Sequence, residues 1–469
     1  MIVSPNAVNL IGPCLNSGQD VTLEAGETYV LTEPIWLTED RVTLDGNGAT
    51  LVLDTSFSNK KYAPHEIHGD VHTAPGPMLV KAIGIYVQAD DVTVKNLKIV
   101  RQTVDGSVVR SVAVAYSHDF TLQNCEFAGD TIGPVIEFIR CDNFLVAECK
   151  IHSVNAVNLG GTLDLTGAGK PNLTGILVDD VDLLSESQRM DESYHSLGFR
   201  IVNNQIADLT MHPSVPAGSP WHAQVDGINV QRGYQFTIQN NVIVNCDEGI
   251  DIMGSRGQIV GNVIKDTSPV AGASAGIKFV HGASYNLCLE NTFINRDICV
   301  MLEHSPGYNL TATGVQHNAI TLNKATGSGA KLFRVSTGPG YNPAFNTVLY
   351  NAGGVTRSDY ALVNEPNFLL GGGVVKVADF SGNRRRDVMF LFPDGRSKIY
   401  NCFSQVPPWQ ITPNYGEINN MANPDDVLVY DWDGDGLPDV LFQLGSDTRR
   451  LYLNQGNGLP FRFVGTVSY

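Results

Sequence analysis

The sequence predicts an all-β protein: a right-handed, single-stranded parallel β-helix followed by a small C-terminal β domain. Short segments of alternating apolar residues recur along most of the chain at intervals of roughly two dozen residues. Glycines recur inside each repeat, which disfavours helices. Near the C-terminus, two polar loops each separate a pair of apolar strands. We expect the β-helix to span residues 1–365, with its coils clearest over 80–305, and the C-terminal domain to span residues 366–469.

Each repeat has two parts, both with the period-two alternation of strands. The first part is a β segment at residues 84–88, 111–115, 135–139, 227–231, 249–253, 276–280 and 299–303. The second follows the frame apolar-x-apolar-x-x-Asn/Cys-x-apolar at residues 92–99, 120–127, 144–151, 199–206, 236–243 and, with Gly in the first position, 257–264. Stacked repeats of this kind bury a continuous core, because each coil covers the inner face of the next.

The sixth position of the frame forms a column: Leu97, Cys125, Cys149, Asn204, Asn241 and Asn262. Equivalent residues of successive coils lie about 4.8 Å apart. We expect the asparagines to hydrogen-bond along the column and the cysteines to pack as small apolar side chains. The pattern resembles the pectin-lyase-like superfamily, which includes polysaccharide hydrolases and lyases, over roughly residues 20–350.

Composition excludes several classes of function. With 48 acidic and 31 basic residues, the chain has a formal net charge of −17, so we expect no nucleic-acid partner. No segment has the length and apolarity of a membrane span, and the N-terminus lacks the basic start and apolar run of a signal peptide. The eight cysteines include no C-x-x-C pair, so neither a zinc site nor a dense disulfide scaffold is indicated.

The loop at residues 431–439 reads DWDGDGLPD and lies between two apolar strands. Alternate residues of a tight turn can point inward, and Ca²⁺ takes six to eight oxygen ligands. The expected ligands are Asp431, Asp433, Asp435, the Leu437 carbonyl and Asp439. An EF-hand is excluded, because Phe442 stands at position 12, where an EF-hand has Glu, and the flanks are β-rich.

A second loop upstream keeps oxygen ligands at four of these positions, namely Asp379, Ser381, Asn383 and Asp387. The two copies resemble FG-GAP/VCBS repeats, the strand–calcium loop–strand units of integrin-type propellers and of many secreted bacterial proteins. The resemblance implies Ca²⁺ as a structural cofactor and an extracellular location. Release by lysis, with display on a virion surface, is the alternative to secretion.

Long insertions interrupt the regular coils, because the frame that starts at Phe144 recurs only at Phe199 and then at Phe236. Function tends to concentrate in such loops. We expect a polysaccharide cleft here, with an aromatic ring stacked on a sugar, although Trp221 could instead pin its own loop. The candidate substrate-binding residues are His195, His212, Trp221, His222, Arg232 and His281.

Two neighbouring coils carry acidic residues beside a Gly-Ile pair. Aligning these pairs stacks Asp226 on Glu248 and Asn229 on Asp251. Carboxylates on adjacent coils would lie about 5 Å apart, so one pKa should rise and leave an acid–base pair. That separation suits a retaining glycosidase, whereas a wider pair formed with Asp247 would suit an inverting one. The alternative is that these residues are only turn formers.

The spacing is similar to that of polygalacturonases, whose N-T-D-G and D-D motifs lie on adjacent coils. Asp226 matches the first motif, and Asp247 with Glu248 matches the second, with Glu in place of the second Asp. The resemblance implies glycoside hydrolysis by these three acids, which is the preferred function. Gln224-Val225 stands in place of Asn-Thr, and no Gly-His-Gly follows one coil later.

Two other functions stay open. In the first, a calcium-dependent polysaccharide lyase or C5-epimerase, the acids hold Ca²⁺ and a lysine removes a proton. Its ligands would be Asp226, Asp247, Glu248 and Asp251, with Lys278 as the base and Arg232 and Arg256 as further cations. The second is a non-catalytic adhesin or tailspike-like receptor-binding protein, for which a homotrimer is common. We expect Glu303, further along the same strand region, to be a solvated surface group.

Overall fold

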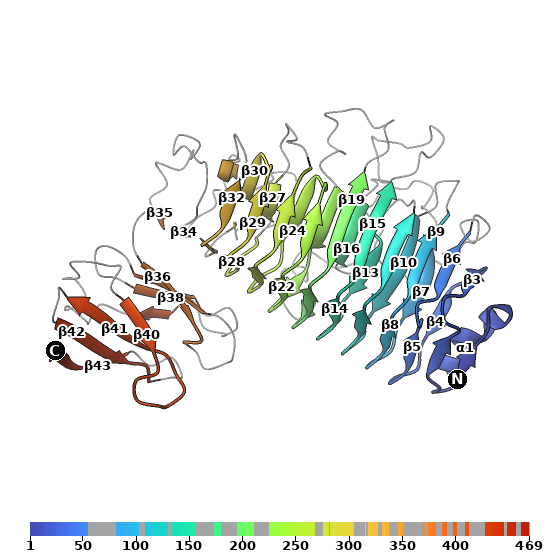
Figure 1. Ribbon diagram of the computed structural model, residues 1–469, viewed down its shortest axis with the longest axis horizontal. Helices are drawn as coiled ribbons and strands as arrows, with labels where there is room; N and C mark the ends of the chain where they lie inside the picture. The colour runs from blue at the N-terminus through green and yellow to red at the C-terminus, as the bar shows by residue number, and fades with distance from the viewer. Residues whose placement is uncertain are drawn as a thin grey trace.

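Figure 1 shows the computed structural model of the chain. The structure describes residues 1–54, 81–102, 108–129, 134–155, 173–179, 195–210, 225–267, 275–280, 282–303, 315, 318–326, 331–336, 346–349, 369–370, 374–380, 387–391, 397–400, 409–411, 427–444, 448–455 and 461–468.

Three long parallel sheets, here named A, B and C, wind around one core (Figure 1). Within the described residues, sheet A has 13 strands in the order β1-β2-β5-β8-β11-β14-β18-β22-β25-β28-β31-β34-β35. They are β1 (Ile2–Val3), β2 (Val21–Leu23), β5 (Thr43–Asp45), β8 (Thr93–Lys95), β11 (Thr121–Gln123), β14 (Leu145–Ala147), β18 (Arg200–Val202), β22 (Thr237–Gln239), β25 (Gln258–Val260), β28 (Leu287–Leu289), β31 (Ala319–Thr321), β34 (Thr347–Leu349) and β35 (Leu369–Leu370).

Sheets B and C each show ten strands in the part of the chain that the structure describes. Sheet B is β3 (Thr28–Leu31), β6 (Thr50–Leu53), β9 (Lys98–Arg101), β12 (Glu126–Gly129), β15 (Lys150–Asn155), β19 (Gln205–Thr210), β23 (Val242–Val244), β26 (Val263–Lys265), β29 (Thr292–Ile294) and β32 (Lys324–Thr326). Sheet C, from its last coil to its first, is β33 (Lys331–Ser336), β30 (Ile298–Glu303), β27 (Ala275–Val280), β24 (Glu248–Ile252), β20 (Val225–Val230), β16 (Leu173–Asp179), β13 (Ile136–Ile139), β10 (Val108–Ala115), β7 (Lys81–Val87) and β4 (Ile35–Leu37).

The chain visits the sheets in the order C, A, B and then rises by one coil, so the predicted parallel β-helix is confirmed. Parallel strands run from Ile2 to Leu370, a few residues beyond the boundary expected at 365. At the N-terminal end, the 3₁₀ helix η1 (Pro5–Leu10) and helix α1 (Ile11–Leu15) cover the first coil, and Ile11 and Leu15 of α1 join the interior. Such a cover protects an otherwise open sheet end.

The corner between sheets A and B has the same backbone in successive coils. A residue in the left-handed region directly follows eight successive strands of sheet A, β8 to β31: Asn96, Asn124, Glu148, Asn203, Asn240, Gly261, Glu290 and Leu322, with φ between 51° and 66°. Asn and Gly adopt this region more readily than other residues. The next residue then turns its side chain into the core, which explains the sixth position of the sequence frame.

The predicted asparagine column is confirmed as a continuous ladder. The Nδ2 of Asn204 donates to Asn241 Oδ1, Asn241 to Asn262, Asn262 to Asn291, and Asn291 to Asn323, each at 2.9–3.0 Å. Each Oδ1 also accepts the backbone N–H of the preceding ladder residue. Four of the five are 0% exposed and Asn323 is 1% exposed, so the ladder is buried and hydrogen-bonded along its length.

A second column, at the first position of the frame, changes composition along the helix. The rings of Phe144, Phe199 and Phe236 stack nearly in parallel, with centroids 4.6 and 5.1 Å apart. Gly257 follows, where a Cβ would collide with the Phe236 ring. Beyond it the column becomes a second amide ladder, formed by Asn286, Asn318 and Asn346.

The C-terminal region forms two antiparallel meanders within its described residues. The first comprises β36 (Val374–Ala378), β37 (Asp387–Leu391), β38 (Ser397–Tyr400) and β39 (Trp409–Ile411), and the second β40 (Val427–Tyr430), β41 (Asp439–Leu444), β42 (Thr448–Leu453) and β43 (Arg462–Ser468). They share one core, since Phe380 and Met389 pack with Val440 and Phe442. The predicted C-terminal β domain is thus confirmed.

Candidate functional site

The candidate site lies on the outer face of sheet C, where β20, β24 and β27 are neighbours. The register pairs Asp226 with Glu248 and Asn229 with Asp251, as the alignment of the two coils predicted. On the next coil Lys278 pairs with Asp251, also as predicted. These strands therefore bring together four of the five residues predicted to be catalytic.

Two glycines place the acidic residues on one face. The register of β20 and β24 skips Gly227 and Gly249, so the alternation slips by one residue there. A Cβ at Gly227 would lie 2.6 Å from the Gly249 carbonyl oxygen, so only glycine allows this approach. Asp226 and Asn229, three positions apart, therefore share the outer face, and Asn229 Nδ2 donates to Asp226 Oδ2 at 2.7 Å.

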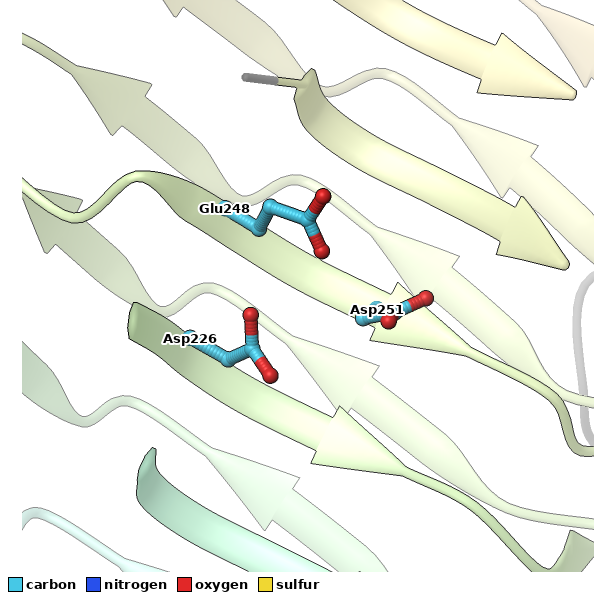
Figure 2. Close-up of side chains that lie close together, drawn as sticks. All are labelled: Asp226, Glu248 and Asp251. Carbon is cyan, nitrogen blue, oxygen red and sulfur yellow. The ribbon is translucent and has the colours of Figure 1, made fainter. Parts of the chain in front are cut away.

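The three acids form a tight, buried cluster. One carboxyl oxygen from each of Asp226, Glu248 and Asp251 lies within 4.8 Å of the others, and each residue is at most 5% exposed. Figure 2 shows Asp226 and Glu248 on adjacent strands and Asp251 further along β24. Asp226 Oδ1, Asn229 Oδ1 and Asp251 Oδ1 are buried without a hydrogen-bond partner in the described structure. Buried polar atoms of native proteins normally have partners, so these oxygens suit a ligand.

A lysine beside the cluster carries the balancing charge. The Nζ of Lys278 lies 3.1 Å from Glu248 Oε1 and 3.2 Å from Glu303 Oε2. Glu303 is half-buried at the end of β30. The expectation that Glu303 is a solvated surface group is therefore wrong, because the neighbouring coil brings the Lys278 ammonium to its carboxylate.

Burial and like charges shift the titration of the whole cluster. Burial raises the pKa of Asp226 to about 7, and the Asp251 carboxylate adds to this. Burial also raises the pKa of Glu248 well above its usual value, against the opposing effect of the Lys278 ammonium, and it raises the pKa of Asp251. For Lys278, burial lowers the pKa, but the carboxylates of Asp251, Glu248 and Glu303 outweigh it, so its pKa is raised. The cluster thus retains a proton near neutral pH, and Lys278 stays charged.

The other predicted site residues are not among the three clustered acids, and some lie outside the described residues. Asp247 is half-buried in the turn before β24. Among the described residues, it is not part of the cluster of three acids. Arg232, after β20, donates from Nη1 to the Gln231 carbonyl at 2.8 Å. Arg256 lies over the rings of Tyr234 and Tyr285, and His195 is half-buried before β17 (Ser196–Leu197), which pairs with β21 (Gly233–Tyr234). His212, Trp221, His222 and His281 lie outside the described residues.

The C-terminal loop brings together part of its predicted ligand set. One oxygen each from Asp431, Asp433 and Asp439 lies within 4.8 Å of the others. Asp431 accepts the N–H groups of Gly434 and Gly436 at 2.8 and 2.9 Å, which folds the loop around its first carboxylate. Asp435 is not in this group of described residues, and its Oδ1 accepts the N–H of Leu437.

In the upstream loop, Asp379 is half-buried and Asp387 begins β37. Ser381 and Asn383 lie outside the described residues, as does the side chain of Asp387.

Sequence reasoning missed a buried ion pair next to the cluster. Arg296, in the corner between β29 and β30, is 2% exposed and lies 2.9 Å from Asp266 Oδ1. A signal was present: Arg296 and Cys246 each follow an asparagine with positive φ, Asn295 and Asn245, so they occupy equivalent corners. The large cationic side chain of Arg296 therefore occupies the position that the small thiol of Cys246 occupies two coils earlier.

A family model described as periplasmic copper-binding protein (NosD) matches residues 174–352, from β16 through the acidic cluster to β34. No curated protein matches the chain. Similar solved structures include PfbA, a surface adhesin of Streptococcus pneumoniae, at 15% identity over 85% of this chain and 94% of that chain, with a TM-score of 0.46. An alginate lyase from Paenibacillus is 12% identical over 79% of this chain and 98% of that one, with a TM-score of 0.43.

The donor atoms of the cluster decide which ions it fits. All are carboxylate or amide oxygens, and hard cations such as Ca²⁺ prefer oxygen ligands. Copper sites in proteins favour imidazole, thiolate and thioether donors. The three unpartnered oxygens therefore fit a hard cation or a hydroxyl-rich ligand better than copper.

Among the described residues, no helix is long and apolar enough to cross a bilayer.

Proposed function

We propose that this protein is a carbohydrate-active enzyme, a glycoside hydrolase whose reaction is carried out by Asp226 and Glu248. The observation that supports this most is the pair of buried carboxyl groups on adjacent coils, with oxygens within 4.8 Å and raised pKa values. Retaining glycosidases use two carboxyl groups about 5–5.5 Å apart, and inverting enzymes need a wider gap. The short separation favours retention.

The charges around the pair suggest a role for each acid. Lys278, 3.1 Å from Glu248, favours negative charge on Glu248. Burial raises the pKa of both acids, so the pair holds a proton near neutral pH, and the Lys278 ammonium beside Glu248 favours the arrangement with that proton on Asp226. In this proposal Asp226 protonates the leaving glycosidic oxygen while the Glu248 carboxylate attacks the anomeric carbon. Water, deprotonated by Asp226, then releases the sugar from Glu248. Asp251 and Asn229 are placed to bind sugar hydroxyls.

A cation-dependent polysaccharide lyase is the second candidate, favoured by the unpartnered oxygens of Asp226, Asn229 and Asp251. These residues and Glu248 would hold a hard cation, which would acidify the proton beside a bound uronate. Lys278 fits the base of this reaction poorly, because its pKa is raised by three carboxylates and a protonated amine removes no proton. The hydrolase is therefore the better-supported proposal.

The test is turnover on a panel of neutral and acidic polysaccharides, following reducing ends together with the ultraviolet absorbance of unsaturated uronates. Wild type is compared with Asp226→Asn and Glu248→Gln, and with exposed Glu39→Gln as the matched control. Reducing ends without absorbance, lost in both site variants but not in the control, support hydrolysis. Absorbance rising with reducing ends supports the lyase. Glycan binding without turnover contradicts both and favours an adhesin.

We also propose that the loop at residues 431–439 binds Ca²⁺ as a structural ion, as FG-GAP-like repeats do. The support is the convergence of Asp431, Asp433 and Asp439, while Asp435 and the Leu437 carbonyl would complete the set. Both a calcium-stabilised domain and a glycan substrate suit a protein that works outside the cytoplasm. An extracellular or periplasmic location is therefore part of this proposal.

A further inference from the structure

We infer that Arg296 is a positioning residue for the site: its guanidinium fixes the starts of β24 and β27, which carry Glu248, Asp251 and Lys278. Arg296 touches none of these three side chains in any hydrogen bond of the described structure. It acts on the backbone that leads into them.

The guanidinium reaches back across two coils. Its Nη1 donates to the Cys246 carbonyl at 2.7 Å and to the two Asp266 carboxylate oxygens at 2.9 and 3.0 Å. Its Nη2 donates to the Ala275 carbonyl at 2.9 Å and to the Asp247 carbonyl. One side chain therefore ties together the corners of three successive coils.

One of these carbonyls lies directly before a site residue, and another lies three positions before one. The Asp247 carbonyl belongs to the peptide bond that leads into Glu248. Ala275 begins β27, three positions before Lys278. A shift of either corner would change the distance between the Glu248 carboxylate and the Lys278 ammonium, now 3.1 Å. Misplacing a reacting group by 1 Å can cost about 100-fold in rate.

Arginine is suited to this task in a way that lysine is not. The planar guanidinium holds several acceptors in fixed directions, whereas an ammonium on a flexible stem is a point charge. The residue at the equivalent corner position two coils earlier is the buried Cys246, so the position itself does not require an arginine, and the Arg296 side chain reaches back to the carbonyl of that corner.

The inference rests on the proposed function only for its effect on turnover. The first variant, Arg296→Lys, keeps the positive charge beside Asp266 but loses the planar guanidinium that donates to the three carbonyls. The second, Arg296→Met, loses both the charge and these hydrogen bonds. Exposed Arg200→Met is the control. We expect Arg296→Lys to keep a melting temperature close to wild type while kcat falls by about 100-fold with KM unchanged. Arg296→Met should lower both kcat and the melting temperature. Recovery of wild-type kcat by Arg296→Lys would overturn the inference.

Two further measurements keep the outcome decisive. Hydrogen exchange at the amides of Glu248 and Ala275 measures how firmly the two corners are held and needs no substrate. It therefore tests the positioning role even if the wild-type protein turns over no glycan in the panel. Faster exchange there in Arg296→Lys supports the inference, and unchanged exchange overturns it. If Arg296→Lys does not fold, Asp266→Asn removes the ion pair but leaves the carbonyl contacts. Retained kcat in Asp266→Asn supports the inference, and a 100-fold loss contradicts it.

Discussion

Two polar columns run along this β-helix, and they differ in how their polar atoms are satisfied. In the column between sheets A and B, Asn241 and Asn262 donate and accept along the ladder and to the backbone. On the outer face of sheet C, Asp226 and Asp251 are also buried, yet each leaves an oxygen without a partner in the described structure. A satisfied polar column stabilises the coils, whereas buried oxygens without partners cost stability, which supports our proposal that the acid column binds a ligand.

The largest expected effect comes from removing the charge on Glu248. Glu248→Gln keeps the shape of the side chain, so we expect kcat to fall about 10²- to 10⁴-fold, the range for a side chain that acts directly in the reaction. The free energy of unfolding should stay equal or rise, since a buried charge is removed. Steady-state kinetics and urea unfolding measure the two effects. Wild-type turnover in Glu248→Gln would show that the acid column has no part in catalysis.

The second effect concerns pH. Because Asp226 has a pKa of about 7 in the folded protein and near 3.8 when unfolded, the folded state binds the extra proton between these values. Stability should therefore fall as pH rises from about 4 to about 7, by up to a few kcal/mol. Asp226→Asn should flatten this dependence. Denaturant unfolding at stepped pH measures it, and an equally steep fall in Asp226→Asn would assign the effect elsewhere.

The ladder should behave in the opposite way to the acid column. Asn262→Ala removes the acceptor of the buried Asn241 backbone N–H, and it takes one of two partners from Asn241 Nδ2 and from Asn291 Oδ1. Each buried group left unpaired should cost about 1–3 kcal/mol. Turnover per folded molecule should be unchanged. Exposed Gln205→Ala is the matched control and should change neither quantity. A loss of kcat in folded Asn262→Ala would mean that the two columns are not separable.

The smallest effect is expected from calcium. If Asp431, Asp433 and Asp439 bind the ion only in the folded state, calcium at ten times Kd adds about 1.4 kcal/mol. Chelation should lower the melting temperature of the C-terminal meanders, and Asp433→Asn should respond less. An unchanged melting temperature after verified removal of bound calcium would contradict the proposed ligand set.

The sequence predicted both columns because repeats place equivalent residues in register. Alignment on Gly227 and Gly249 was enough to pair Asp226 with Glu248, and the frame was enough to stack the asparagines. The burial of Asp226 and Asp251 and the lack of partners for their oxygens could not be predicted, because both depend on the slip at the glycines and on the packing around the cluster.

Contacts that span several coils were also beyond the sequence. The Arg296 guanidinium reaches carbonyls about fifty residues earlier in the chain. The change from stacked Phe rings to the ladder of Asn286 and Asn318 at Gly257 likewise follows from three-dimensional fit. The local sequence pattern predicts which residues share a column, but only the three-dimensional packing shows which of their polar atoms have no hydrogen-bond partner.

The most direct test measures kcat and the free energy of unfolding of Asp226→Asn on one preparation, beside Asn262→Ala. The account predicts that Asp226→Asn loses turnover and is as stable as wild type or more stable, while Asn262→Ala is destabilised and keeps its turnover. Retained turnover in Asp226→Asn, or a loss of stability as large as that of Asn262→Ala, would contradict the claim that the acid column is a functional site.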